Sequence, residues 1–213
     1  MDPVGTLELG FPFAGRWRTE NSPASRIPSH GTTAFGSSHA IDFVMVDERG
    51  RSAPYGWRTP VATEPAEIFL GHGAPILAPV AGEVVAVHDG EPDHEARRSR
   101  LLLIGYALTQ GRRATRGIAG LAGNHVVLAA GGSGPYVVLA HLRPGSPRVR
   151  AGERVTVGQA LAACGNSGNS TEPHVHVQAS DSLDFAGASG VPIVFRATDG
   201  RTWLPATGEI VLV

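Results

Sequence analysis

The run VRAGERVTVGQALAACGNSGNSTEPHVHVQ, from Val149 to Gln178, carries the most informative pattern in the chain. It ends in two histidines two residues apart, His174 and His176, directly after the turn-rich run Gly165–Ser170. In an extended strand, residues i and i+2 point to the same face. If 174–177 is a strand, both imidazoles therefore face one spot. Since histidine is the commonest metal ligand and readily moves protons near neutral pH, the pair predicts half of a metal site.

Length and composition fit one globular domain. The chain has 213 residues, of which 42% are apolar, and this is enough for one domain with a sizeable core. We therefore predict a single domain over 1–213. Glycine (28 residues) and proline (16 residues) are abundant and aromatic residues make up 6%, which favours many turns and short strands. A net charge of -1 gives no field that attracts nucleic acid or a membrane surface, so neither is predicted as a partner.

Cysteine and lysine usage narrows the chemistry. The single cysteine, Cys164, lies in an apolar run and is predicted to be a buried thiol, so the fold holds without an internal disulfide. The sequence contains no lysine. This excludes lysine Schiff bases, the lysine of a phosphate-binding P-loop and lysine-attached prosthetic groups.

Short strand-like segments follow one another from residue 75 onward. They are rich in β-branched residues and bounded by glycine-containing turns, a pattern typical of antiparallel sandwiches and barrels rather than of alternating β and α units. We therefore predict an all-β, mainly antiparallel fold, either a sandwich or a barrel. The expected strands are 40–46, 75–79, 82–88, 124–129, 136–141, 154–157 and the His-Val-His segment.

Other stretches are expected to lie outside the sheet. The first 40 residues are broken by Pro, Gly and Ser and are predicted to form loop and edge structure. Residues 47–70 and 89–122 are predicted to be two long loop insertions between core strands, where loops commonly carry binding residues. Within the second insertion, the apolar run Leu101–Leu108 fits either a strand or a short helix.

Four further residues are candidates to complete a site with the histidine pair. Asp42 lies inside an apolar strand, where a carboxylate needs a partner or a cation, and His141 closes the strand 136–141. His30 and His39 compete for one role. Because His39 is three residues from Asp42, the two point to opposite faces of a regular strand, whereas the loop around His30 can fold back to either face. On geometry we prefer His30.

Five stretches together resemble the lysostaphin-type zinc metallopeptidases, also called the duplicated-hybrid-motif peptidases. The resemblance covers most of 30–180, and its second half is the more specific. The stretches are Ala40–Phe43, Pro75–Val85, Gly123–Leu128, Ala140–Leu142 and the run from Val149 to Gln178.

The resemblance implies a duplicated-hybrid-motif β fold, one zinc ion and peptide-bond hydrolysis. By motif, the implied zinc ligands are an N-terminal histidine, Asp42 and His176, while His141 and His174 act beside the metal. Three protein ligands leave the fourth position of a catalytic zinc to water, whose pKa then falls to about 7. His141 and His174 then move protons or steady the charge on the scissile carbonyl oxygen. The implied substrates are peptidoglycan stem or cross-bridge peptides.

One departure from the family pattern keeps a second function open. The family has His-x-Gly-x-Asp, whereas this chain has Ser38 at the histidine position and Ala40 at the glycine position. If His30 replaces the missing ligand, the chain is an enzyme. If nothing replaces it, the chain is a catalytically inactive peptidoglycan-binding or regulatory domain of the same fold.

Two other functions fit the sequence less well. Part of the run from Val149 also resembles biotinyl and lipoyl carrier domains, which the absence of lysine excludes, and a histidine phosphocarrier leaves Asp42 unexplained. No stretch approaches the roughly 18 apolar residues of a membrane span, and Met1-Asp2-Pro3 does not open a signal segment. The chain as written is expected to be cytoplasmic, and a processed form is expected at the cell wall. The oligomeric state stays open.

Overall fold

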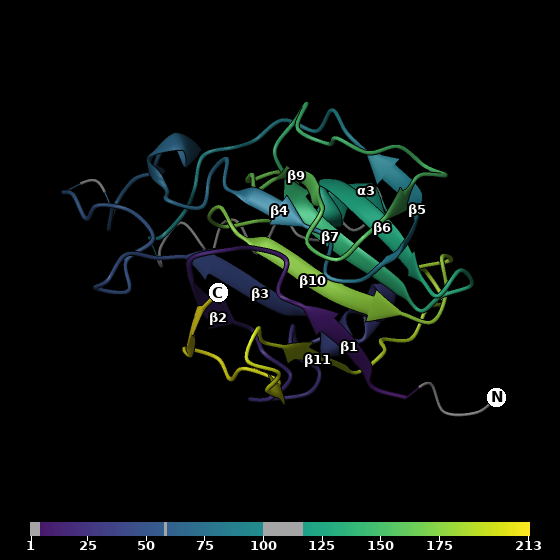
Figure 1. Ribbon diagram of the computed structural model, residues 1–213. Helices are drawn as coiled ribbons and strands as arrows, with labels where there is room; N and C mark the ends of the chain where they lie inside the picture. Colours follow the sequence, from purple (N-terminus) through teal and green to yellow (C-terminus); the bar gives the residue numbers. More distant parts are fainter. Residues whose placement is uncertain (1–4, 58, 100–116) are drawn as a thin grey trace.

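The computed structural model describes residues 5–57, 59–99 and 117–213. Its centre is an eight-stranded sheet, and every strand pair within it is antiparallel (Figure 1). In spatial order the strands are β13 (Ile210–Leu212), β2 (Arg16–Glu20), β3 (Ile41–Met45), β10 (Val175–Ser180), β7 (Tyr136–Leu142), β6 (Asn124–Ala130), β5 (Gly82–His88) and β8 (Arg154–Val155).

Two small sheets complete the described strands. One contains β1 (Leu7–Gly10), β11 (Ile193–Arg196) and β12 (Thr202–Trp203), and its β1–β11 pair is parallel. The other pairs β4 (Pro75–Leu77) with β9 (Ala160–Ala163) in antiparallel fashion. The predicted all-β, mainly antiparallel class is therefore confirmed. The eight-stranded sheet stays open within the described residues, with β13 and β8 at its edges, so the barrel alternative is not found there.

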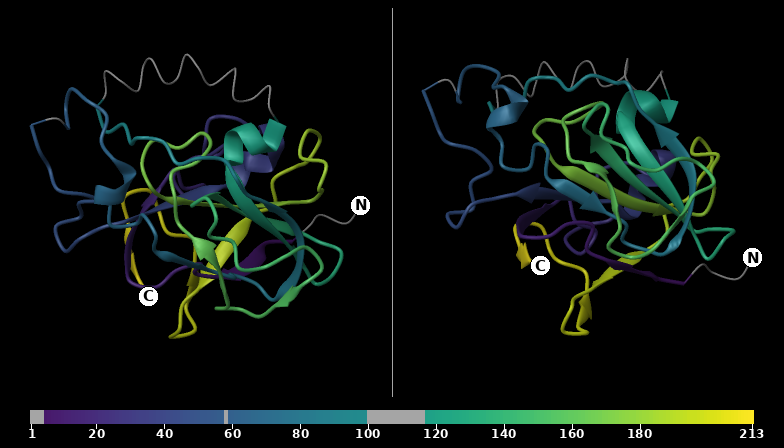
Figure 2. Two further views of the ribbon diagram at one scale, coloured as in Figure 1. Left: turned by 90° about the horizontal axis from the view of Figure 1, so that it is seen from above. Right: turned by 45° about the horizontal axis from the view of Figure 1, so that its top comes forward.

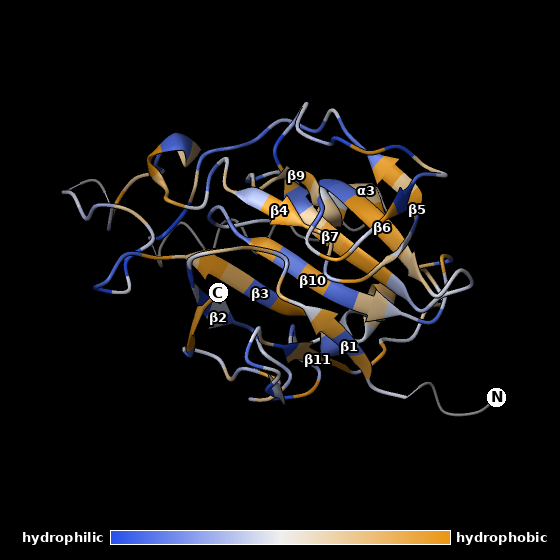
Figure 3. Ribbon diagram, viewed as in Figure 1, coloured by the Kyte–Doolittle hydropathy of each residue, from blue (hydrophilic) through white to orange (hydrophobic). Residues whose placement is uncertain are grey.

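Hydrophobic and hydrophilic residues alternate along β10 (Figure 3). Because successive residues of a strand point to opposite faces, the large sheet has one apolar face and one mixed face. On β10, Val175 and Val177 belong to the main core, whereas His176 between them faces the other side. The small sheets pack on the apolar face through residues such as Phe195 and Leu161. The structure is thus a sandwich whose core fills the space between the large and the small sheets.

The opposite face is partly covered by two short helices. The 3-10 helix η1 (Ala34–His39) contacts β10, and α3 (Gly117–Ala122) contacts β6. Both lie on the same side of the large sheet (Figure 2). They leave the middle of this face, where β3, β10 and β7 run side by side, as the floor of a hollow.

The two predicted insertions contact each other. Between residues 47 and 70 the described regular structure is the 3-10 helix η2 (Ala66–Ile68), and the second insertion ends in α3. An antiparallel bridge joins Glu64 to Ala96, and Arg98 forms an ion pair with Glu64 at 2.6 Å. The expectation for Leu101–Leu108 lies outside the described residues.

The prediction that the first 40 residues form only loop and edge structure is wrong in one respect. Strand β2 lies inside the large sheet between β13 and β3, and its Trp17 is fully buried in the core. None of the helices in the described ranges is both long enough and apolar enough to span a membrane.

Candidate metal and catalytic site

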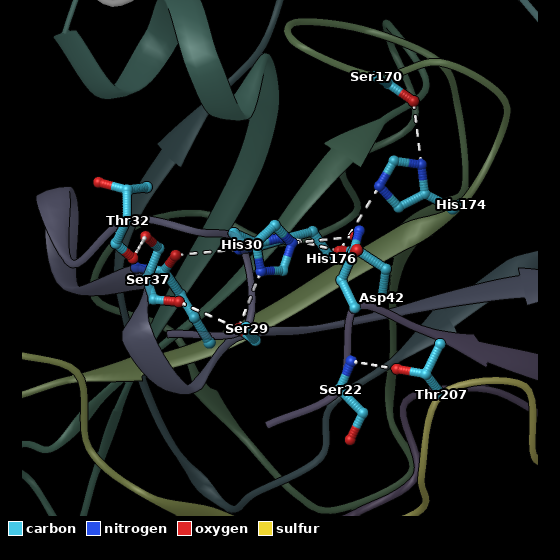
Figure 4. Close-up of polar contacts among 12 residues, drawn as sticks. Ser22, Ser29, His30, Thr32, Ser37, Asp42, Ser170, His174, His176 and Thr207 are labelled. Carbon is cyan, nitrogen blue, oxygen red and sulfur yellow. Dashed lines mark hydrogen bonds and ion pairs between the residues drawn. The ribbon is translucent and has the colours of Figure 1, made fainter. Parts of the chain in front are cut away.

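Three of the predicted ligands converge on one point above the open face of the large sheet (Figure 4). Ligand atoms of His30, Asp42 and His176 all lie within 4.8 Å of one another. The Nε2 atom of His30 lies 3.0 Å from Oδ2 of Asp42, and Nδ1 of His176 lies 2.9 Å from Oδ1 of the same carboxylate. Two imidazole nitrogens and a carboxylate oxygen at this spacing can hold a metal ion.

The sheet register places two of these side chains and a loop supplies the third. His176 on β10 is the cross-strand partner of Asp42 on β3, so both side chains leave the same face. His30 comes from the loop before η1, where the Ser29 hydroxyl lies 3.0 Å from its Nδ1 and the Ser29 amide donates to the Ser38 carbonyl. The loop thus folds back over β3, as the preference for His30 requires.

The side chains of Ser38 and His39, the two competing positions, contact each other and not Asp42. Ser38 is buried, and its hydroxyl lies 3.0 Å from Nδ1 of His39. Neither residue belongs to the group of potential ligands among the described residues. The structure therefore brings His30, and not His39, to Asp42. The assignment of ligand and catalytic roles stays a prediction.

The Asp42 carboxylate is held in its charged form by its surroundings. Burial works to raise its pKa, but His30, His174 and the hydrogen bond with His176 outweigh burial and hold the pKa of Asp42 well below its usual range. Asn21 adds a neutral donor, with its amide nitrogen 2.8 Å from Oδ2. A charged, oriented carboxylate is the form that binds a cation.

The ring of His176 is fixed at both nitrogens. Its Nδ1 faces Asp42, and its Nε2 lies 2.9 Å from the side-chain oxygen of Gln178. Burial works to lower its pKa, but the hydrogen bond and the charge of Asp42 raise the pKa of His176 above its ordinary value. Gln178 in turn donates its amide to the Phe35 carbonyl at 2.9 Å.

His141 and His174 lie beside the three converging residues, with ring centroids 4.6 Å apart. Nδ1 of His141 lies 2.9 Å from the Ser167 carbonyl, and Nδ1 of His174 lies 2.8 Å from the Glu172 carbonyl. Because a carbonyl only accepts, both Nδ1 atoms carry a proton, which leaves a lone pair on Nε2 of a neutral His141. Nε2 of His174 lies 3.6 Å from Oδ1 of Asp42. Burial, followed by the neighbouring His174 and His176, holds the pKa of His141 well below its usual range.

His141 reaches this face because β7 contains a bulge. Ladder partners shift between Asn124 and Val126 on β6, so that two β7 residues, Ala140 and His141, stand opposite one. His141 has φ +60, a left-handed conformation that is uncommon for residues other than glycine. Without the extra residue, alternation would turn the side chain after Ala140 towards the core.

Sequence reasoning missed two residues that support the converging group, Asn21 and Gln178. Gln178 continues the period of two from His174 and His176, so alternation alone could have placed it on the same face. Asn21 follows a strand that was not predicted, and its residue type carries no signal of its own.

The residues of the candidate site line a hollow of about 280 Å³. Its floor is formed by β3, β10 and β7, one side by η1 and the other by α3. The lining residues include all five predicted site residues, His30, Asp42, His141, His174 and His176, together with Asn21, Gln178 and the apolar side chains of Ile118 and Leu121.

Comparison with known proteins confirms the resemblance found in the sequence. Residues 105–184 match the model of Peptidase family M23, and this segment includes His141, His174 and His176. The match supports a peptidase, and hence a peptide substrate. Among curated protein sequences, none matches the chain.

Several solved structures are similar at low identity. The catalytic domain of the prophage-encoded M23 protein EnpA from Enterococcus faecalis is 19% identical, with a TM-score of 0.46 over 89% of this chain and 94% of that one. The catalytic domain of the antimicrobial peptidase lysostaphin from Staphylococcus simulans is 18% identical, with a TM-score of 0.40 over 75% and 80%. A zinc-containing peptidase from Vibrio cholerae is 19% identical, with a TM-score of 0.34 over 66% and 46%.

Proposed function

From the match of residues 105–184 to Peptidase family M23, we propose that this chain is a zinc-dependent endopeptidase acting on peptidoglycan stem or cross-bridge peptides. The observation that carries the proposal is the convergence of His30, Asp42 and His176 within 4.8 Å, beside two further histidines, His141 and His174, whose Nδ1 atoms are held by backbone carbonyls. The substrate class is the one that the sequence resemblance implies.

The chemistry of the donor set fits zinc. Zinc in proteins takes imidazole nitrogens and carboxylate oxygens, and a catalytic site has three protein ligands with one position open. His30, Asp42 and His176 supply two nitrogens and one oxygen, and the hollow leaves them accessible from one side. One zinc ion held there supplies the Lewis acidity that makes water a nucleophile near neutral pH and polarises the scissile carbonyl.

The protein's own side chains supply the proton transfers. His141 presents Nε2 as a base, because the Ser167 carbonyl holds the proton on Nδ1. Its lowered pKa keeps it neutral, which is the form that takes a proton from water. His174 directs Nε2 towards the same site, 3.6 Å from Oδ1 of Asp42. When Nε2 carries a proton, His174 can donate it to the leaving amine or steady the carbonyl oxygen.

Zinc content and hydrolysis measured together test this function. We expect about one zinc per chain by mass spectrometry of the metal, and release of peptides from peptidoglycan that stops on chelation and returns with zinc. Asp42→Ala and His176→Ala should lose both properties, whereas His141→Ala should keep zinc and lose hydrolysis. His39→Ala is the matched control and should keep both.

Two results would change the conclusion. Hydrolysis that survives in both Asp42→Ala and His176→Ala would overturn the assignment. Stoichiometric zinc without hydrolysis of any peptidoglycan peptide would favour a catalytically inactive binding or regulatory domain. The reason to consider that function is Ser38, which stands at the usual position of the histidine ligand.

A further inference from the structure

A second hollow, here called the arginine hollow, opens between the two insertions and has a volume of about 670 Å³. Among the described residues, its charged lining consists of four arginines from three segments and one glutamate. These residues are Arg18, Arg51, Arg97, Arg98 and Glu172. Nothing in the zinc chemistry proposed above uses the four arginines.

One short segment separates the arginine hollow from the zinc site. Thr171 lines both hollows. The Glu172 carbonyl accepts from Nδ1 of His174 on one side, while the Glu172 carboxylate accepts from the Ser52 hydroxyl at 2.5 Å on the other. The two hollows therefore lie next to each other, with Thr171 in the wall of both.

The sheet register gives the spacing between the two hollows. Glu20 on β2 is the partner of Asp42 on β3, and Arg18 lies two residues along β2 on the same face. Diagonal neighbours of this kind have Cα atoms roughly 7–8 Å apart. An extended peptide rises about 3.3 Å per residue. A group bound beside Arg18 is therefore about two or three residues from the bond held at Asp42.

The arginines differ in how firmly they are held. Arg98 makes two bonds to the buried Glu64, at 2.6 and 2.8 Å, and stacks 5.0 Å above the Phe69 ring, so it belongs to the frame of the insertions. Arg18 is also held, because it has only 27% of its side chain exposed and donates to the Gly50 carbonyl at 2.6 Å. Arg51 is more open, with 47% of its side chain exposed and its Nε 3.2 Å from Asp47. Their ion-pair partners, Glu20 and Asp47, lie outside the lining of the arginine hollow.

Exposed ion pairs of this kind contribute little to stability and exchange readily. A ligand carboxylate can therefore take the place of Asp47 at the Arg51 fork, whose planar donors match a carboxylate in bidentate geometry. Arg18, Arg51 and Arg98 each face an acidic partner, so the selection of an anionic ligand rests on the donor geometry of the exposed Arg51 fork and not on a net positive field.

We propose that the arginine hollow binds a carboxylate of the substrate peptide, two or three residues from the bond that is cut. This inference rests on the proposed function, because it names a specificity subsite of the same enzyme. The two insertions then select acidic peptides, while the catalytic residues act on the peptide bond itself.

A pair of peptides tests the subsite. One carries a carboxylate two or three residues from the cleaved bond, and the other carries the corresponding amide. We expect wild-type protein to prefer the acid form about tenfold in KM, as one bidentate arginine contact implies. Arg51→Gln should bring the preference close to unity. Arg49→Gln is the matched control, because Arg49 is in the same exposed turn but outside the lining, and it should keep the preference.

Direct binding separates failure of the subsite from failure of the proposed function. Fluorescence polarisation of the two labelled peptides with the full-length protein, without added metal, measures binding when no hydrolysis occurs. An acid preference that Arg51→Gln removes supports the subsite even then. Equal binding of acid and amide by wild-type protein, or an equal loss for both forms in Arg51→Gln, would overturn it.

Discussion

A neutral side chain, Gln178, decides which nitrogen His176 can offer to a metal. The amide of Gln178 donates to the Phe35 carbonyl, so its oxygen must face His176. Nε2 of His176 therefore carries a proton, and Nδ1 is the atom that can bind a cation beside Asp42. Phe35 itself has a left-handed conformation, with φ +58.

Replacing Gln178 tests this dependence at the scale of one residue. We expect Gln178→Leu to bind zinc about 10–100-fold more weakly, because the ring of His176 loses its orientation. Gln178→Glu retains an acceptor for Nε2–H and should recover most of the affinity. Competition with a chromogenic chelator measures both. Equal affinity in Gln178→Leu and wild-type protein would show that Asp42 alone orients the ring.

Because Cys164 is buried, we expect the free energy of unfolding to fall as the pH rises into the alkaline range. Burial, with a smaller contribution from Asp93, raises the pKa of its thiol far above the ordinary value. Above about pH 8.5 the unfolded chain therefore loses this proton while the folded chain keeps it, so unfolding becomes easier as pH rises, by up to about 1.4 kcal/mol per pH unit. The chain has no lysine and only three tyrosines to mask the effect.

Urea unfolding between pH 8 and pH 10 measures that slope. Cys164→Ala should show a flatter dependence of the unfolding free energy on pH than the wild-type chain. An equally steep loss in Cys164→Ala would assign the slope to other groups.

The residues of the converging group were largely predictable, for reasons that differ from one to the next. Asp42 and His176 follow from a carboxylate in an apolar strand and from alternation, which are local rules. His30 required excluding His39 on strand geometry, and the loop that carries it has no repeating pattern. Asn21 was missed because its contact to Asp42 spans 21 residues of chain and depends on a strand that was not recognised.

At the scale of elements, the prediction failed where strands are short or irregular. Strand β2 has only five residues, three of them charged, yet it alternates between core and open face and is held between β13 and β3. Its pairing with the far C-terminal β13 cannot be read from local sequence. The bulge at Ala140 and His141 is equally invisible, because a regular strand and a bulged strand share the same composition.

Helix α3 and the loop after Cys164 meet at Gly123, where a side chain does not fit. Gly123 has φ +59, and an added Cβ would lie 2.5 Å from the Ser167 hydroxyl oxygen and 2.6 Å from the Gly168 nitrogen. Gly123→Ala should therefore destabilise the fold by about 1–3 kcal/mol more than a left-handed glycine elsewhere. It should also slow hydrolysis, because the Ser167 carbonyl orients His141.

Gly131→Ala is the control for this prediction. Gly131 has φ +67 but no atom within 4 Å of the added Cβ. It should show only the backbone cost of the left-handed conformation, about 1–2 kcal/mol. Equal unfolding free energies for the two variants in urea would mean that the contact between Gly123 and the loop yields easily.

At the scale of the whole molecule, the two ends of the chain close the core together. Phe11 stacks on Phe195 with ring centroids 4.8 Å apart, and Phe13 stacks on Trp17 at 4.6 Å. Phe43 on β3 contacts this group through Phe195 at 5.4 Å. Segments before residue 30 and after residue 180 therefore supply much of the aromatic core beneath β3.

The segment 30–180, to which the sequence resemblance extends, should not fold alone. Strands β2 and β11 lie outside this segment, so Phe43 and Ile41 would lose the partners that bury them. Each buried aromatic side chain that is removed costs about 3–5 kcal/mol of folding free energy. We expect this fragment to lack a cooperative thermal transition by circular dichroism, in contrast to the full chain. A fragment that melts cooperatively would show that the terminal segments are accessory.

The bulge in β7 allows a single deletion in the gene to remove a catalytic candidate without disturbing the sheet. If the codon for His141 is lost, Leu139, Ala140 and Leu142 follow one another in regular alternation, and Leu142 still points into the core. The bulge closes and the sheet keeps its register. An in-frame deletion of three nucleotides should therefore yield a protein with a similar melting temperature and no hydrolytic activity.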